Sequence, residues 1–456
     1  MKYISVFVFL MFAANSADKP NIIFIMCDDM GYGQLGSYGQ KMIKTPRLDQ
    51  MAKEGLRLTD YYAGTAVCAP SRCSLMTGQH VGHTYIRGNK EYPTGQEPIP
   101  AETITVAEKM KEAGYATALI GKWGLGYPGS EGEPNKQGFD YFFGYNDQKH
   151  AHNHFPKFLL RNEETLTLKN NSGKEIEYSQ YMLTDEAKGF IKKNKDNPFF
   201  LYLAYVIPHS RLQIPGDDEC YLQYKDESWP EKQKKHAGMI SRLDKDVGSI
   251  LDLLKEMNLA ENTLVVFTSD NGAHREGGAR PEFFNDSGPL SGIKRSMYEG
   301  GVRVPFIAHW PGVIKPGQVS NHIGAHWDLM PTACELGGVQ PPEGIDGISY
   351  VPLLKGNMEE QEKHDYLYFE LHWPTKRGVR KGDWVALQSK TSAIDPNKDT
   401  IKLFNLKNDL GQKKDLATQY PEKVEEFKKI FLEAHTPAPL FEFGQAKPKR
   451  NKKGKK

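Results

Sequence analysis

The sequence has few cysteines, little net charge and almost no long apolar run. The chain has five cysteines in 456 residues. This number is odd, and it is too small for a disulfide framework that would stabilise a large exported chain. Lys and Arg together number 59 and Asp and Glu 57, which leaves a net charge of +2. No internal repeat is visible, so a solenoid or propeller is not expected. The five cysteines are Cys27, Cys68, Cys73, Cys220 and Cys334.

The one marked apolar run lies at the N-terminus. Lys2 precedes the run Ile4–Phe12, and small residues follow up to Ala17. This pattern predicts a secretory signal peptide over residues 1–17, cleaved near Ala17. The run is too short to span a bilayer as a permanent helix, and no later segment is long and apolar enough. We therefore expect a secreted or periplasmic protein without a membrane span.

The charge is uneven along the chain, because residues 447–456 hold seven basic groups and no acid. A solvated, disordered tail over residues 441–456 is one interpretation. The other is that the tail holds a polyanion by charge attraction. Nucleic acid is an unexpected partner for an exported protein, whereas a sulfated polysaccharide fits both the charge and the location.

Short apolar runs with helical patterns between them predict an α/β fold. A capping box at Thr105 and Glu108 begins one helix, which ends at Gly114. A second helix carries one apolar face from Met239 to Leu254. This alternation indicates a large, mostly parallel mixed sheet covered by helices on both faces. The predicted strands are Asn21–Met26, Ala116–Ile120, Phe199–Ile207, Thr263–Thr268 and Val304–Ala308.

The pattern changes after Asp346-Gly347. Short strands are expected at Tyr366–Leu371, Asp383–Leu387 and Lys402–Leu406, followed by a helix from Pro421. The sequence therefore predicts a catalytic domain over residues 18–357 and a small antiparallel subdomain with one helix over residues 358–440.

Polar residues follow four of the predicted strands. In open parallel sheets, ligands sit beyond the carboxyl ends of the strands, so these side chains describe one candidate site. The two acidic pairs among them supply only oxygen ligands, which suits calcium or magnesium and argues against zinc or copper. Turn residues are the alternative for either pair taken alone. The strand-end residues are Asp28, Asp29, Lys122, His209, Asp270 and Asn271.

The most specific motif surrounds Cys68. Pro70 follows it at +2, Arg72 at +4 and Thr77-Gly78 at +9 and +10. We expect Pro70 to be the first residue of a helix, where its missing N–H costs nothing. Residue 68 would then lie just ahead of a helix N-terminus, which favours an anion. A structural cysteine beside a helix start is the alternative.

Taken in order, these motifs resemble a type I, formylglycine-dependent sulfatase of the alkaline phosphatase superfamily, over nearly the whole mature chain. The resemblance implies that a maturation enzyme oxidises Cys68 to formylglycine (3-oxoalanine). The hydrated aldehyde would attack sulfur, release the alcohol, and then expel sulfate to restore the aldehyde. Further matching motifs are Lys19–Phe24, Gly121–Trp123, Pro208-His209, Ser269–Gly272, Gly292–Lys294, Glu299–Pro305, Asp328–Thr332, Asp346-Gly347 and Leu416-Ala417.

The resemblance also assigns roles to single residues. Arg72 would stabilise the hydrated aldehyde, and Lys122 and Lys294 would hold sulfate oxygens. His209 would bind sulfate or protonate the leaving oxygen. One divalent cation, calcium in the first place and magnesium as the alternative, would act as Lewis acid and template. Its expected ligands are Asp28, Asp29, residue 68, Asp270 and Asn271.

One position departs from the family pattern. The family has histidine two residues after the lysine, where this chain has Gly124. That histidine is thought to contact the formylglycine hydroxyl, so the base for the last step is unassigned. The stretch His150, His152 and His154 is expected either to supply a substitute, to bind substrate, or to be a polar loop without a role.

The leaving alcohol is not readable from motifs. Export, the basic tail and loops around Trp373 and Lys376-Arg377 indicate a sulfated carbohydrate, with Trp373 and Arg211 as candidate contacts; core packing of Trp373 is equally compatible. A formylglycine-dependent phosphonate monoester or phosphodiester hydrolase is the nearest alternative. A sulfoglycan-binding protein with an unmodified Cys68 is another.

Overall fold

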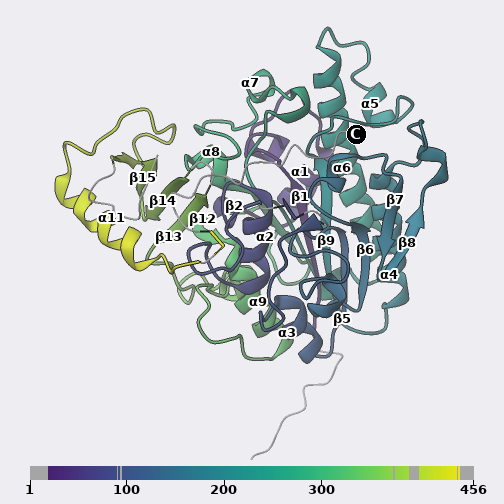
Figure 1. Cartoon of the computed structure of the whole chain (residues 1–456), viewed down its shortest axis with the longest axis horizontal. Helices are drawn as coiled ribbons and strands as arrows, with labels where there is room; N and C mark the ends of the chain where they lie inside the picture. The colour runs from purple at the N-terminus through teal and green to yellow at the C-terminus, as the bar shows by residue number, and fades with distance from the viewer. Residues whose placement is uncertain are drawn as a thin grey trace, which may run out of the picture.

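A ten-stranded mixed sheet forms the body of the protein. The structure is a computed structural model that describes residues 19–89, 91–92, 95–372, 375–389, 400–438 and 440–441. The strand order is β12-β2-β11-β10-β1-β9-β5-β6-β7-β8 (Figure 1). Their bounds are β12 Gln318–Ala325, β2 Leu56–Tyr62, β11 Arg303–His309, β10 Thr263–Ser269, β1 Asn21–Asp28, β9 Phe199–Pro208, β5 Ala116–Lys122, β6 Tyr141–Tyr145, β7 Phe158–Arg161 and β8 Glu164–Thr167.

The five central strands, β10, β1, β9, β5 and β6, run parallel. On one side β11 is antiparallel to β10 and to β2, and β12 is parallel to β2. On the other side β7 and β8 form an antiparallel hairpin beside β6. The predicted mostly parallel mixed sheet is confirmed. All five predicted strands exist, and each is one or two residues longer than predicted, so that Asp28 and Lys122 are the last residues of their strands.

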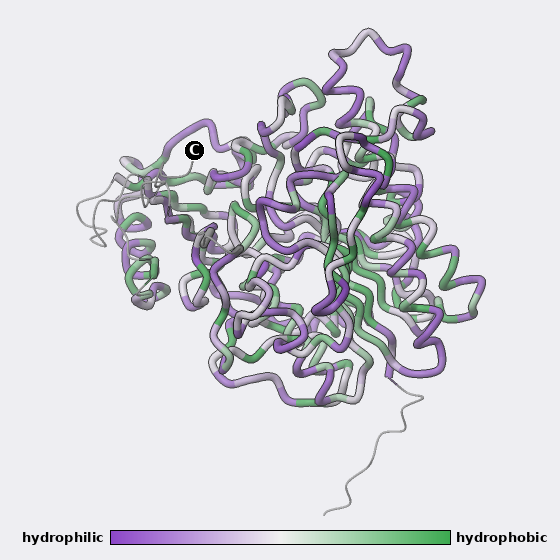
Figure 2. The backbone as a smooth tube through the Cα atoms, turned by 45° about the vertical axis from the view of Figure 1, so that its right-hand side comes forward, coloured by the Kyte–Doolittle hydropathy of each residue, from purple (hydrophilic) through white to green (hydrophobic). Residues whose placement is uncertain are grey.

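Helices cover both faces of the sheet, as predicted. Alternate residues of β1 enter different cores: Ile23 and Ile25 pack toward one face, and Ile22 and Phe24 toward the other. Figure 2 shows the apolar central strands enclosed by more polar outer segments. The first core includes α1 (Pro46–Glu54), α4 (Ser179–Lys193) and α6 (Glu231–Glu256), and the second α2 (Cys68–Thr77), α3 (Val106–Glu112) and α9 (Leu329–Gly337).

The remaining short elements are α5 (Glu219–Leu222), α7 (Pro281–Phe284), α8 (Glu299–Val302), α10 (Val351–Leu354), and a two-stranded ribbon of β3 (Glu91–Tyr92) and β4 (Gly95–Gln96). The capping box at Thr105 is present at the start of α3. In the described part of the chain, no helix combines the length and apolar character that crossing a membrane requires.

The C-terminal residues form a second, smaller sheet. Its four antiparallel strands follow chain order, and Phe427 and Phe431 of the last helix pack on one face (Figure 1). The opposite face packs Phe369 and Val385 against Trp327, which joins the small sheet to the large one. The elements are β13 (Leu367–His372), β14 (Thr375–Lys381), β15 (Trp384–Ser389), β16 (Ile401–Asn405) and α11 (Pro421–Glu433).

One expectation about this region is wrong. Lys376 and Arg377 belong to strand β14 rather than to a loop, and Arg377 is buried, where its Nε donates to Oε1 of Gln388 at 2.7 Å. The arginine therefore stabilises the small sheet and is not available to a sugar. The predicted signal peptide, the basic tail and Trp373 lie outside the described residues.

Candidate active site

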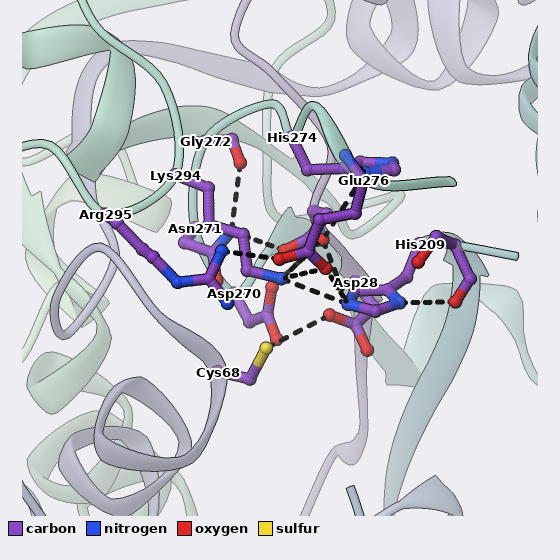
Figure 3. A network of polar contacts seen from close by, with 12 residues as sticks. Asp28, Cys68, His209, Asp270, Asn271, Gly272, His274, Glu276, Lys294 and Arg295 are labelled. Atoms are coloured by element: carbon purple, nitrogen blue, oxygen red, sulfur yellow. Dashed lines mark hydrogen bonds and ion pairs between the residues drawn. The ribbon is translucent and has the colours of Figure 1, made fainter. Parts of the chain in front are cut away.

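The polar residues after the central strands meet at one edge of the sheet. Cys27 of β1 is in register with Ser269 of β10, so the residues that follow, Asp28-Asp29 and Asp270-Asn271, lie side by side. The backbone N–H of Asp29 donates to Oδ1 of Asp270 at 3.0 Å. Asp29 has φ of 68°, a left-handed conformation that aspartate tolerates better than most residues. This turn directs both pairs of side chains into one cluster (Figure 3).

Cys68 enters this cluster from the start of α2. From the sequence, Pro70 was expected to be the first residue of this helix. The helix begins at Cys68, so Pro70 is its third residue. The N–H of a third helical residue also has no partner within the helix, so proline is tolerated there for the same reason. Sγ of Cys68 lies 3.5 Å from Oδ1 of Asp28, and the residue is only 1% exposed.

Two cations neutralise the carboxylates nearest to Cys68. Nζ of Lys122 donates to Oδ2 of Asp28 at 2.6 Å. The guanidinium of Arg72 donates to Oδ2 of Asp270 at 2.7 Å and to the backbone carbonyl of Lys122 at 2.8 Å. Because all four side chains are buried, these contacts are charge-assisted hydrogen bonds shielded from water.

A lysine and a histidine contact Asp29. Nζ of Lys294 donates to its Oδ2 at 2.7 Å, and Nε2 of His209 lies 3.2 Å from the same oxygen. Nζ of Lys294 and Nε2 of His209 are 3.0 Å apart. Asn271 donates through Nδ2 to Oδ1 of Asp29 at 2.7 Å, while its own Oδ1 is buried and has no hydrogen-bond partner among the described residues.

The electrostatics of the cluster follow from this pairing. Burial would raise the pKa of Asp28, but Lys122, His209 and Arg72 hold it well below its usual value. Burial and then the neighbouring Asp28 raise the pKa of Asp270. The pKa of the Cys68 thiol is raised strongly by burial and then by Asp28. An unmodified Cys68 is therefore a neutral thiol and a poor nucleophile at neutral pH.

Three functional-site residues were not found from the sequence. Oε2 of Glu276 lies 3.3 Å from Nε2 of His209 and 3.4 Å from Nζ of Lys294, and its other oxygen pairs with Arg295. His274 stacks parallel to His209, with ring centroids 5.6 Å apart. His274 and Glu276 lie in the loop after β10, and Arg295 directly follows Lys294 in the chain (Figure 3). No motif in the sequence distinguishes them from ordinary loop residues.

The three histidines of the 150–154 stretch differ in their surroundings. His152 stacks on His209 with ring centroids 4.4 Å apart. Nε2 of His154 contacts the backbone carbonyl of His209 at 3.0 Å, which fixes the backbone of that residue. His150 instead stacks on Phe158 and accepts from a backbone N–H, away from the cluster. Arg211 is exposed, and its backbone N–H donates to the carbonyl of His152 at 2.9 Å.

A group of two carboxylates, one thiol and one histidine could hold a metal ion; it contains the predicted ligands Asp28, Asp29 and Cys68, whereas Asp270 is not part of it. Asp28, Asp29, Cys68 and His209 each offer one ligand atom, and these atoms lie within 4.8 Å of one another. The unpartnered Oδ1 of Asn271 adds an amide oxygen to the same place. Carboxylate and amide oxygens are the ligands that calcium and magnesium prefer.

A buried helix-start cysteine, an oxygen-rich donor set and several converging cations define a site for esters of a tetrahedral oxyanion. The comparisons with known proteins agree. The sulfatase family model matches residues 20–339, and a model of the C-terminal part of N-sulphoglucosamine sulphohydrolase matches residues 293–433. The chain therefore belongs to the sulfatase family, the sulfuric ester hydrolases with an alkaline-phosphatase-like fold.

Individual relatives support the assignment. The chain is 36% identical to an arylsulfatase of Hemicentrotus pulcherrimus, covering 81% of this chain and 70% of the relative. It is 33% identical to the N-acetylgalactosamine-6-sulfatase of Homo sapiens, covering 77% and 69%. A solved structure of Ps i-CgsB in complex with k-i-k-neocarrahexaose superposes with a TM-score of 0.80 at 30% identity, covering 94% and 95%. A phosphonate monoester hydrolase of Agrobacterium radiobacter, 18% identical with a TM-score of 0.66, shares the fold.

Proposed function

We propose that the protein is an exported sulfatase that hydrolyses sulfate esters of a sulfated carbohydrate. The observation that supports this proposal most strongly is the position of residue 68. It lies at a helix start, 3.5 Å from Asp28, and Lys122, Lys294 and His209 contact the Asp28-Asp29 pair next to it. Cations on several sides of one buried side chain suit a substrate whose sulfate group must be held against it. Relatives named for N-acetylgalactosamine-6-sulfate and a neighbour solved with a carrageenan oligosaccharide support the carbohydrate.

The nucleophile that we propose is the formylglycine formed from Cys68. The buried thiol is held neutral, so the unmodified cysteine would attack sulfur slowly. A formylglycine hydrate would supply an oxygen nucleophile and a built-in route for releasing sulfate. This step requires a maturation enzyme as a partner of the protein. The proposal also includes export, directed by the N-terminal apolar run.

The surrounding side chains would position residue 68, bind the sulfate group and assist the leaving group. Arg72, buried and fixed to the backbone of Lys122, positions residue 68 from the helix side. Lys122 and Lys294 offset negative charge as the S–O bond breaks. His209, whose Nε2 lies 3.0 Å from Nζ of Lys294, would bind sulfate or protonate the leaving oxygen. A bound calcium or magnesium ion would act as a Lewis acid toward a sulfate oxygen, held by Asp28, Asp29, Asp270 and Asn271.

The test is release of sulfate and of phosphate from a panel of sulfated oligosaccharides and phosphoesters. The protein is co-expressed with a formylglycine-generating enzyme, and a peptide mass across residue 68 reports conversion. Cys68→Ala should abolish sulfate release. Cys73→Ala is the matched control, because Cys73 is buried in the same helix but belongs to the apolar core.

Sulfate release that depends on Cys68 and not on Cys73 would support the proposal. Phosphate release exceeding sulfate release would favour the phosphonate or phosphodiester hydrolase alternative. A Cys68 that stays a thiol, together with binding of sulfated sugars and no turnover, would favour the sulfoglycan-binding alternative. The panel also identifies the sugar and the sulfated position.

A further inference from the structure

Gly124 stands where the family has a histidine, and the structure shows what fills the space. Gly124 has φ of 84°, and a Cβ atom built on it would lie 2.4 Å from Nε2 of Gln148 and 3.6 Å from Cδ of Arg72. The amide of Gln148 therefore occupies the position that a side chain at 124 would take. It stands beside the arginine that reaches the catalytic cluster.

The amide of Gln148 is buried and unsatisfied by the protein. The residue is 2% exposed, and neither Nε2 nor Oε1 has a hydrogen-bond partner among the described residues. Nε of Arg72 next to it is also buried without a partner. Leaving a buried amide unpaired costs folding free energy, so an amide in this position points to a ligand.

The segment that carries Gln148 is anchored on both sides. The backbone N–H of Asn146 donates to Nδ1 of His150 at 3.2 Å, and Oδ1 of Asp147 accepts from the N–H of His150 at 2.8 Å. Four residues after Gln148, His152 stacks on His209. The segment after β6 therefore places Gln148 near Gly124 and Arg72, and His152 against His209.

We propose that Nε2 of Gln148 donates a hydrogen bond to an oxygen of the substrate's sulfate group, on the side of the site that Gly124 leaves open. The inference rests on the proposed function and adds a sulfate-binding residue to it. An amide neither gains nor loses a proton in the working pH range. Gln148 therefore holds the sulfate oxygen and does not take over proton transfer from a histidine.

Binding is measured by calorimetry in Cys68→Ser protein, which holds its substrate without formylglycine turnover. The probes are inorganic sulfate and the sulfated oligosaccharide that the converted wild type hydrolyses. Adding Gln148→Ala to this protein should raise the dissociation constants of both probes about five- to tenfold, which corresponds to the loss of one hydrogen bond. Gln137→Ala is the matched control: Gln137 is equally buried, but its Nε2 donates to the carbonyl of Glu131 at 3.1 Å, outside the site.

Two further variants separate binding from folding. Gln148→Glu keeps the shape but replaces the donor by a carboxylate, and should weaken binding more than Gln148→Ala at unchanged melting temperature. In converted enzyme, Gln148→His should add a new titration to the pH profile of kcat, which a purely structural role would not produce.

Unchanged sulfate and oligosaccharide affinity in Gln148→Ala, with wild-type turnover confirmed, would overturn the inference and leave the sulfatase function standing. Equal losses in Gln148→Ala and Gln137→Ala would also overturn it, since they would indicate a general packing defect. Absence of sulfate ester hydrolysis by converted wild type would overturn the inference together with the proposed function.

Discussion

Two of the buried charge clusters among the described residues differ in how completely they are paired. The first is the catalytic cluster around Asp28 and Asp29. The second, the β2–β14 cluster, joins the two sheets: Arg303 bridges Asp60 at 3.0 Å and Glu299 at 3.2 Å, and Arg380 bridges Asp60 at 2.7 Å. The hydroxyl of Tyr62 donates to Glu299 at 2.6 Å.

Both clusters are rich in opposite charges, so charge balance does not distinguish them. What distinguishes them is unused hydrogen-bonding capacity. In the β2–β14 cluster no buried side-chain nitrogen or oxygen is left without a partner, within the described residues. The catalytic cluster leaves Oδ1 of Asn271, Nε of Arg72 and the Gln148 amide unpaired. In this comparison, complete pairing accompanies the cluster that joins the two sheets, and unpaired polar atoms accompany the candidate binding site.

The largest expected effect is on the catalytic cluster. Removing the divalent cation with a chelator should abolish sulfate release, and calcium should restore it, because Asp28 and Asp29 are among its proposed ligands. Saturating cation, at about 100 times its dissociation constant, should also stabilise the fold by about 2.7 kcal/mol. The measurement is turnover and thermal unfolding against calcium concentration.

Asp28→Asn should lose both responses to calcium, whereas Asp60→Asn should keep both. A calcium-dependent increase in melting temperature that survives in Asp28→Asn would show that the cation binds elsewhere.

The next effect concerns stability alone. Asp60→Asn removes the carboxylate that faces two buried arginines and should lower the free energy of unfolding by about 3–5 kcal/mol, because it leaves buried positive charge uncompensated. The turnover of the folded fraction should not change. Urea denaturation and turnover per folded molecule check this prediction, and a large fall in turnover would mean that the two clusters are coupled.

A smaller, pH-dependent effect follows from the same carboxylate. Burial would raise the pKa of Asp60, but Arg303 and Arg380 lower it below its ordinary value of about 3.9. Its contribution to stability is therefore present above about pH 4 and is lost as the pH falls toward the folded-state pKa. The stability difference between wild type and Asp60→Asn should shrink between about pH 5 and pH 3. A constant difference across that range would contradict the prediction.

The smallest effect is expected at the surface. Arg47 pairs with Asp252 at 2.5 Å, but the two side chains are 40% and 64% exposed. Asp252→Asn should change the free energy of unfolding by less than about 1 kcal/mol, since exposed pairs are screened by water and salt. Urea denaturation measures this change, which is the reference for the variants of the two buried clusters. A loss of unfolding free energy as large as that of Asp60→Asn would contradict the prediction that buried pairs contribute more than exposed ones.

The sequence predicted which side chains meet in the candidate active site, because most of them follow buried apolar runs. Asp28, Lys122, His209 and Asp270 each lie at the end of a central strand, and parallel strands place such ends together. Lys294 and Cys68 were found through resemblance, not through strand pattern. Glu276 and Gln148 were missed, because the loops that carry them have no periodicity and reach the site only through tertiary packing.

The edges of the fold were predicted less well. Strand β12 is only half-buried along much of its length, and β8 is mostly exposed, so neither shows a continuous apolar run. Strand β14 is rich in basic residues, and Arg377 is buried because its nitrogens find acceptors in the neighbouring strand and helix. Side-chain pairing of this kind depends on register between distant segments, which local sequence patterns do not encode.

The position of β1 at the centre of the sheet has a consequence for the order of events during synthesis. Ile22 pairs with Phe200 on one side and with Leu264 on the other, so the first strand made waits for residues that leave the ribosome much later. Such long-range pairing makes folding slow. Until Lys294 has been made, the cluster of polar side chains around residue 68 is incomplete. A cysteine that is 1% exposed in the finished protein is thus within reach of another enzyme during that interval.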